Sequence, residues 1–163
     1  RLSLVGSEMC IRDSPTGADL PRLLADLRAG RAPGADRWRR ERDRLTRLAG
    51  SSGGSASPGA VLALARPERI ARRVADGSRS YLLASGTRAA LPEGSGLLGA
   101  PWLAVWEVQR AQGRAADGTG AVIRAAAPLT EDEALDLGAG LLVEERTARL
   151  ENGTVRALSL IHI

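Results

Sequence analysis

One stretch, residues 59–93, reads GAVLALARPERIARRVADGSRSYLLASGTRAALPEG and contains the change from helical to β periodicity that decides the fold. Its apolar first part predicts a helix over residues 59–65. Pro67 either kinks that helix or opens a second one, which ends near residue 75 and carries the basic turn PERIARR. After Gly77 the pattern changes, and residues 81–84 predict a short strand. The boundary between a helical block and a β block therefore lies within this stretch.

The residues before this stretch predict two helices. The first follows Asp19, which can cap it, and has Pro21 in its first turn and leucines at helical spacing up to Gly30. The second begins near Asp36, and residues 31–49 contain seven Arg and three acids. This helix could contact phosphates, but a solvated face with i,i+4 ion pairs is favoured, and the expected pairs are Arg37–Glu41 and Arg39–Asp43. Residues 50–57 (GSSGGSAS) have the composition of a flexible linker.

The residues after Gly77 predict a β domain. Short strands are expected at 81–84, 87–91, 102–108, 120–127, 141–150 and 154–157, with Asn152-Gly153 as a hairpin turn. A short helix at 129–137 begins with a capping box of Thr130 and Glu133. The pattern predicts an α+β chain, in which a small N-terminal helical block precedes an OB-like antiparallel β-barrel.

Composition restricts the possible chemistry. The chain has 163 residues, 44% of them hydrophobic, and a formal net charge of +4, and all its basic residues other than His162 are Arg because Lys is absent. Residues 1–14 and 158–163 resemble translated sequencing-adapter read-through, and we interpret them as foreign tails. The single Cys, Met and His (Cys10, Met9 and His162) lie in these tails. Without them a zinc site, a Cys nucleophile and a Ser-His-Asp triad lack a required residue. The scarcity of Cys fits a cytoplasmic protein.

An acidic cluster occupies residues 131–136, where three acids stand in the first turn of the expected helix. A catalytic carboxylate site is one interpretation of this cluster. Acids in a first helical turn are, however, explained by their favourable interaction with the helix dipole. We favour the structural explanation.

Several segments resemble one known family. LALARPERIARR (62–73) and YLLASGTRAAL (81–91) are similar to the junction between the helical and OB-like domains of HrpB-type ATP-dependent helicases, which are bacterial relatives of the DEAH-box RNA helicases. GAPWLAVWEV (99–108) resembles the family's tryptophan-led strand, IRAAAPL (123–129) a later strand, and DRWRRERDRLTRLAG (36–50) its arginine-rich helix. The resemblance covers about residues 17–157. Arg66 departs from it, standing where an aromatic residue is usual, and so does Ala84, standing where Ser is usual.

The resemblance implies an internal helicase fragment. Residues 15–76 would be a helical-domain remnant and residues 77–157 the OB-like domain, and the two RecA-like motor domains would be missing. A helicase motor needs a phosphate-binding loop with a Lys, so this chain as it stands is not expected to be an ATPase. No cofactor is expected here, and ATP and Mg²⁺ would belong to the motor domains.

Nucleic-acid binding is the role that the resemblance implies for this region. The expected partners are single-stranded nucleic acid, with RNA favoured over DNA, and the RecA-like domains of the same protein. Arg side chains would contact phosphates and an aromatic would stack on a base. Trp102 and Trp106 are expected in the core. The candidate site residues are Arg72, Arg73, Arg79 and Arg88, with Tyr81 as the exposed stacking residue.

Two alternatives remain open at this point. The chain could be a free-standing OB-type nucleic-acid-binding module. It could instead be a protein-interaction domain that docks through its barrel, in which case it would not bind RNA.

Overall fold

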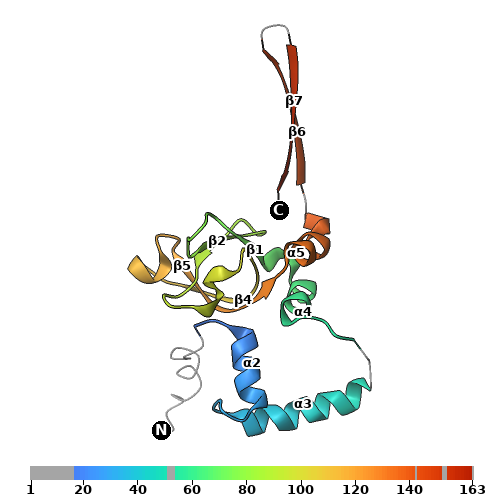
Figure 1. Cartoon of the computed structure of the whole chain (residues 1–163), viewed down its shortest axis with the longest axis vertical. Helices are drawn as coiled ribbons and strands as arrows, with labels where there is room; N and C mark the ends of the chain where they lie inside the picture. The colour runs from blue at the N-terminus through green and yellow to red at the C-terminus, as the bar shows by residue number, and fades with distance from the viewer. Residues whose placement is uncertain (1–16, 51–53, 142, 152–153, 163) are drawn as a thin grey trace, which may run out of the picture.

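The structure is a computed structural model, and it describes residues 17–50, 54–141, 143–151 and 154–162. Three helices come first: α2 (Leu20–Arg28), α3 (Ala35–Ala49) and α4 (Pro58–Ala65). A five-stranded barrel follows, then the short helix α5 (Glu131–Leu137) and a C-terminal hairpin (Figure 1). The expected order of a helical block before a β domain is confirmed.

The barrel is closed and OB-like. Its strands are β1 (Ile70–Arg73), β2 (Ser80–Leu83), β3 (Arg88–Ala90), β4 (Trp102–Arg110) and β5 (Ala121–Leu129), in the order β1-β2-β3-β5-β4, with β1 also paired to β4. Every pair is antiparallel except β3 and β5, which run parallel and meet at Ala90 and Val122. The parallel pair arises because β4 lies between β5 and β1, so that two strands of the same direction become neighbours. The expected OB-like barrel is confirmed, and this one parallel pair is the exception among its antiparallel strands.

Strand β1 corrects a second expectation, because PERIARR is not a turn of α-helix. Pro67 has no N–H to continue α4, which ends at Ala65 and is followed by the 3-10 turn η1 (Pro67–Arg69). Residues 70–73 then hydrogen-bond with β2 on one side and with β4 on the other. Two sets of ladder hydrogen bonds outweigh the local helical spacing. The barrel therefore begins N-terminal to Gly77, where we had expected its boundary.

The last two strands do not join the barrel. β6 (Val143–Glu151) and β7 (Thr154–His162) pair with each other as a separate hairpin, which projects away from the barrel beyond α5 (Figure 1). Strands in both places were expected, but as part of the β domain. The Asn152-Gly153 turn and residues 1–14 lie outside the described residues. Residues 158–162 pair with 143–147, and their foreign origin stays a prediction.

Two apolar clusters hold the domain together. One fills the barrel and the other lies on its outer surface beneath α4 and α5. The outer cluster is made of Ala63, Ile70, Trp102, Ala104, Leu129 and Ala134. Trp102 is buried, as expected, although it faces the covering helices and not the barrel interior.

Tyr81 lies in the barrel interior, and its expected exposure is wrong. The side chain has no solvent-exposed surface, and its hydroxyl donates a hydrogen bond to the carbonyl oxygen of Ala100 at 2.7 Å. Along β2 the side chains alternate, so Tyr81 and Leu83 point inward while Leu82 points outward. A ring in this position cannot stack on a base. Burial raises the pKa of the Tyr81 phenol.

The two covering helices are joined at their N-termini. The Ser57 hydroxyl caps α4 by accepting the N–H of Ala60, and it donates to the Glu133 carboxylate at 2.8 Å. Glu133 also accepts the backbone N–H of Thr130, which completes the expected capping box of α5. These hydrogen bonds lower the pKa of Glu133, first through the Thr130 N–H and then through Ser57. This carboxylate therefore has a structural role.

The N-terminal segment is attached to the barrel at β5. The backbone N–H of Ala126 donates to the Ala18 carbonyl at 2.9 Å, four residues along β5 from Val122, where β5 meets β3. The Ser95 hydroxyl donates to the Gly17 carbonyl. Asp19 then caps α2 by accepting the N–H of Arg22, as expected. The helical block thus starts from the barrel wall.

At Gly59 the backbone of α4 lies close against β5, and Gly59→Ala should destabilise the protein. An added Cβ would lie 2.2 Å from the Pro128 carbonyl oxygen and 3.0 Å from a Leu129 methyl. The backbone of β5 would have to shift to make room, so we expect a loss of roughly 1–3 kcal/mol in the free energy of unfolding. The higher helix propensity of Ala, about 0.5–1 kcal/mol, offsets only part of this loss. Urea denaturation measures this loss. Gly99→Ala is the matched control, since nothing lies within 4 Å of its added Cβ; equal stability of the two variants would contradict the close approach.

Tyr81→Phe should cost about 1 kcal/mol at neutral pH, because it removes a buried hydrogen bond. The pH dependence has a definite sign. Because the pKa is raised in the folded protein, the unfolded chain ionises first, and the wild type should lose stability above about pH 10 while the Phe variant is spared this loss. Urea denaturation at neutral and alkaline pH measures the difference. Tyr81 is the only tyrosine, so ultraviolet titration of the folded protein reports it alone; an ordinary pKa would contradict its burial.

Candidate nucleic-acid interface

The outer face of the barrel carries a short basic row across three strands. Arg72 of β1 lies opposite Leu82 of β2, and Leu82 lies opposite Arg88 of β3. All three side chains are exposed. Neither arginine has a carboxylate partner among the described side chains, and Arg72 lies 5.5 Å from the centre of the Trp102 ring. Two cations of the predicted set are therefore together and available to an anion.

Arg73 and Arg79, the other predicted phosphate ligands, hold the structure instead. Arg73 Nη1 donates to the Leu98 carbonyl at 2.7 Å, and its side chain is 16% exposed. Arg79 Nη1 donates to the Leu91 carbonyl at 3.0 Å, and its Nη2 lies 3.5 Å from the Asp117 carboxylate. In a strand, neighbouring side chains point to opposite faces, so Arg72 and Arg73 do not present one surface. The four predicted arginines thus fall into two groups: Arg72 and Arg88 are exposed cations, and Arg73 and Arg79 make hydrogen bonds that stabilise the fold.

Trp106 was expected in the core, and the structure corrects this. Its side chain is 44% exposed on β4, beyond the cover of α4 and α5. The β4–β5 register steps from Val105 to Glu107 while β5 advances by a single residue, so Trp106 is the extra residue of a β-bulge. Arg66 lies 5.0 Å from the ring centre. The sequence did contain a signal for this exposure. Trp102, Ala104 and Trp106 all lie on the outer face of one strand, and two short helices cannot cover all three.

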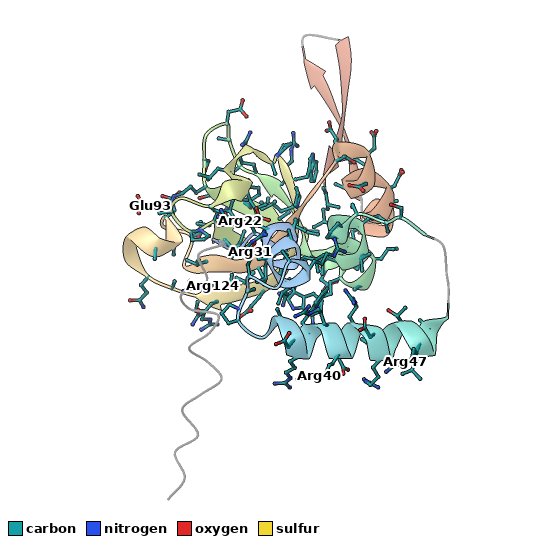
Figure 2. The ribbon with its side chains drawn as sticks, turned by 60° about the horizontal axis from the view of Figure 1, so that its bottom comes forward. Arg22, Arg31, Arg40, Arg47, Glu93 and Arg124 are labelled. Atoms are coloured by element: carbon teal, nitrogen blue, oxygen red, sulfur yellow. The ribbon has the colours of Figure 1, made fainter. Side chains whose placement is uncertain are left out.

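The arginine-rich helix α3 is a solvated surface with ion pairs along it. The pairs differ from those expected: Asp36 pairs with Arg39, Glu41 with Arg44 and Asp43 with Arg42. The hydrogen bond from Arg44 lowers the pKa of Glu41. Arg40 and Arg47 have no carboxylate partner among the described side chains, and Figure 2 shows Arg40 on the side of α3 away from the barrel. The expected pair of Arg37 and Glu41 is present only as an electrostatic attraction, which also lowers the pKa of Glu41. Each acid offsets one cation, and the helix retains a positive charge.

Metal chemistry finds no support in the described part of the chain. Its His, Cys, Asp and Glu side chains form no group of three or more that could hold an ion. The acids of α5 lie in its first turn, as the helix dipole favours. No helix among the described residues is long and apolar enough to cross a membrane. What the site offers is positive charge and one exposed ring.

No family model and no curated protein matches the chain. Solved structures do match. The crystal structure of the E. coli DExH-box NTPase HrpB shares 25% sequence identity, and the match covers 94% of this chain and 19% of that chain with a TM-score of 0.64. The crystal structure of the Escherichia coli DEAH/RHA helicase HrpB shares 23% identity over 92% of this chain and 18% of that chain, with a TM-score of 0.58.

The chain therefore spans about a fifth of the length of the solved proteins that it matches. Its helices, OB-like barrel and C-terminal hairpin are nearly all included in the match. The resemblance that five segments of the sequence indicated is confirmed, and the chain is similar over nearly its whole length to one region of an HrpB-type DExH-box helicase.

Proposed function

We propose that this chain is an accessory part of an ATP-dependent RNA helicase, and that it binds single-stranded nucleic acid through the outer face of its barrel. The observation that carries the proposal is the likeness to HrpB, a DExH-box NTPase, over 94% of the chain. The exposed row of Arg72 and Arg88 gives that likeness a chemical basis. In OB folds the face of strands 2 and 3 is the usual oligonucleotide surface.

The contacts in this proposal are electrostatic. Arg72 and Arg88 would each approach a phosphate, and both are exposed without a carboxylate to compete. Arg73 and Arg79 leave the predicted set, because each holds a backbone carbonyl inside the fold. Tyr81 leaves it because it is buried.

Catalysis in this proposal belongs to the longer protein. ATP, Mg²⁺ and two RecA-like motor domains would be supplied by other parts of it, and the chain itself contains no Lys for a phosphate-binding loop. The described part of the chain also exposes large apolar side chains on α3 and α4, which suit contact with such neighbouring domains; they are Leu45, Leu48, Val61 and Leu64. A cytoplasmic location stays a prediction.

These apolar side chains also favour the second candidate, a protein-interaction domain. Val61 is 53% exposed and Leu64 67% exposed on the side of α4 that turns away from the barrel. A domain that acts only in this way would not bind RNA. Salt-dependent RNA binding separates the two functions.

Arg72→Gln and Arg88→Gln should each weaken binding of a short single-stranded RNA. Each loses one phosphate contact, so the slope of log affinity against log salt should become shallower by roughly 0.7 per substitution. Fluorescence anisotropy over a salt series measures both the affinity and the slope. Arg28→Gln is the matched control, because it removes the same charge from an exposed position on α2.

Stability should be unchanged in Arg88→Gln and should fall by no more than about 1 kcal/mol in Arg72→Gln, which loses only its contact with the Trp102 ring. If the wild-type chain fails to bind RNA at low salt, or binds with a flat salt response, the nucleic-acid role is wrong and the interaction domain is favoured.

A further inference from the structure

Trp106 has an unusual setting for a large apolar side chain. It stands at a β-bulge, so its backbone has left the regular β4–β5 ladder. The ring is nearly half exposed, whereas Trp102, four residues earlier on the same outer face, is buried beneath α4 and α5. Bulges re-aim side chains and are frequent beside functional sites. The bulge here turns an indole toward solvent.

Two arginines contact Trp106, one at its backbone and one at its ring. Arg69 Nη1 donates to the Trp106 carbonyl at 2.8 Å, which satisfies the oxygen that the bulge releases from the ladder. Arg66 stacks over the ring, 5.0 Å from its centre. A guanidinium over an indole is a cation–π contact that water does not abolish. One arginine thus binds the backbone of Trp106, and another, exposed and charged, covers its ring.

This cluster lies farther along β1 and β4 than the basic row, and the buried pair Ile70 and Ala104 stands between Arg72 and Trp106. The backbone N–H of Ser85, in the turn that leads to Arg88, donates to the Glu68 carbonyl at 3.0 Å, next to Arg69. Arg69, the last residue of η1, precedes Arg72 of β1 by three residues, so their Cα atoms lie at most roughly 10 Å apart. Glu68 and Glu107 are the acids adjacent in sequence, so the cluster is not uniformly basic. An aromatic ring flanked by arginines along a backbone-binding surface is the arrangement that binds unpaired bases.

We propose that Trp106 is the stacking platform for one unpaired nucleobase, and that Arg66 moves from the ring to the adjoining phosphate when the base binds. The proposal rests on the proposed nucleic-acid function and adds a base-contacting site to it. The base replaces the guanidinium on the indole, and the guanidinium gains the negatively charged phosphate as its new partner. Trp106 therefore takes the role that the sequence had given to the buried Tyr81.

The test compares two strands of the same length on the full chain. One is an oligoadenylate of about 12 nucleotides, and the other is an abasic ribose-phosphate strand. Trp106→Ala should weaken binding of the oligoadenylate about 5- to 150-fold, the range expected for one stacked base. It should leave the abasic strand and the salt slope unchanged. Trp106→Phe should keep most of the affinity, because it keeps a ring.

Controls separate stacking from other roles. Trp38→Phe changes another tryptophan beneath an arginine, Arg42 at 5.2 Å, but on α3 and away from the barrel, and should leave both affinities unchanged. Trp106→Leu keeps an apolar side chain without a π face and should behave like Trp106→Ala. Thermal melting of each variant must match the wild type before affinities are compared.

The outcomes are distinct. If Trp106→Ala binds both strands as tightly as the wild type does, the platform is wrong while the proposed function stands. If Trp106→Leu restores oligoadenylate binding, or the two strands lose affinity equally, the ring makes a plain apolar contact and stacking is overturned. If the wild type binds neither strand at low salt, the proposed function itself fails and the platform fails with it.

Discussion

The hydrogen-bonded pairing of β1 with both β2 and β4 is the contact on which the rest of the structure depends. The four residues of β1 close the barrel, because this strand pairs with β2 along one edge and with β4 along the other. Closure removes the exposed edges that a five-stranded sheet would otherwise present. It also divides the side chains of β1 between two environments. Ala71 enters the interior, while Ile70 and Arg72 face outward.

The outer surface then acquires two different regions. Where α4 and α5 pack, Ile70, Trp102 and Leu129 form a second apolar cluster, held at its rim by the hydrogen bond between Ser57 and Glu133. Outside this covered area the surface is exposed, and it carries Arg72 and Arg88 in one place and the ring of Trp106 in another. Short helices thus produce the candidate interface by leaving part of the barrel wall uncovered.

Arginine has two separate uses in this chain. Arg73 and Arg79 donate to backbone carbonyls inside the fold, where a planar guanidinium with several fixed donors can satisfy more than one acceptor. Arg66, Arg69 and Arg72 lie on or beside the barrel's outer face, and two of them stack on tryptophans. Net charge alone cannot distinguish these uses, because the same residue type serves both. For Arg72 and Arg73, which are neighbours on β1, the alternation of side chains along the strand decides which use each residue has.

The amino-acid sequence by itself determined the helical block, the cap at Asp19, the capping box at Thr130 and four of the five barrel strands, since each of these depends on neighbours within a few residues. It also carried the family resemblance. Tertiary structure alone decided the rest. PERIARR has helical spacing, yet its last residues became β1 because two partners distant in sequence offered hydrogen bonds. Tyr81 and Trp106 exchanged their expected places because exposure depends on which face of the closed barrel a residue occupies and where the covering helices end.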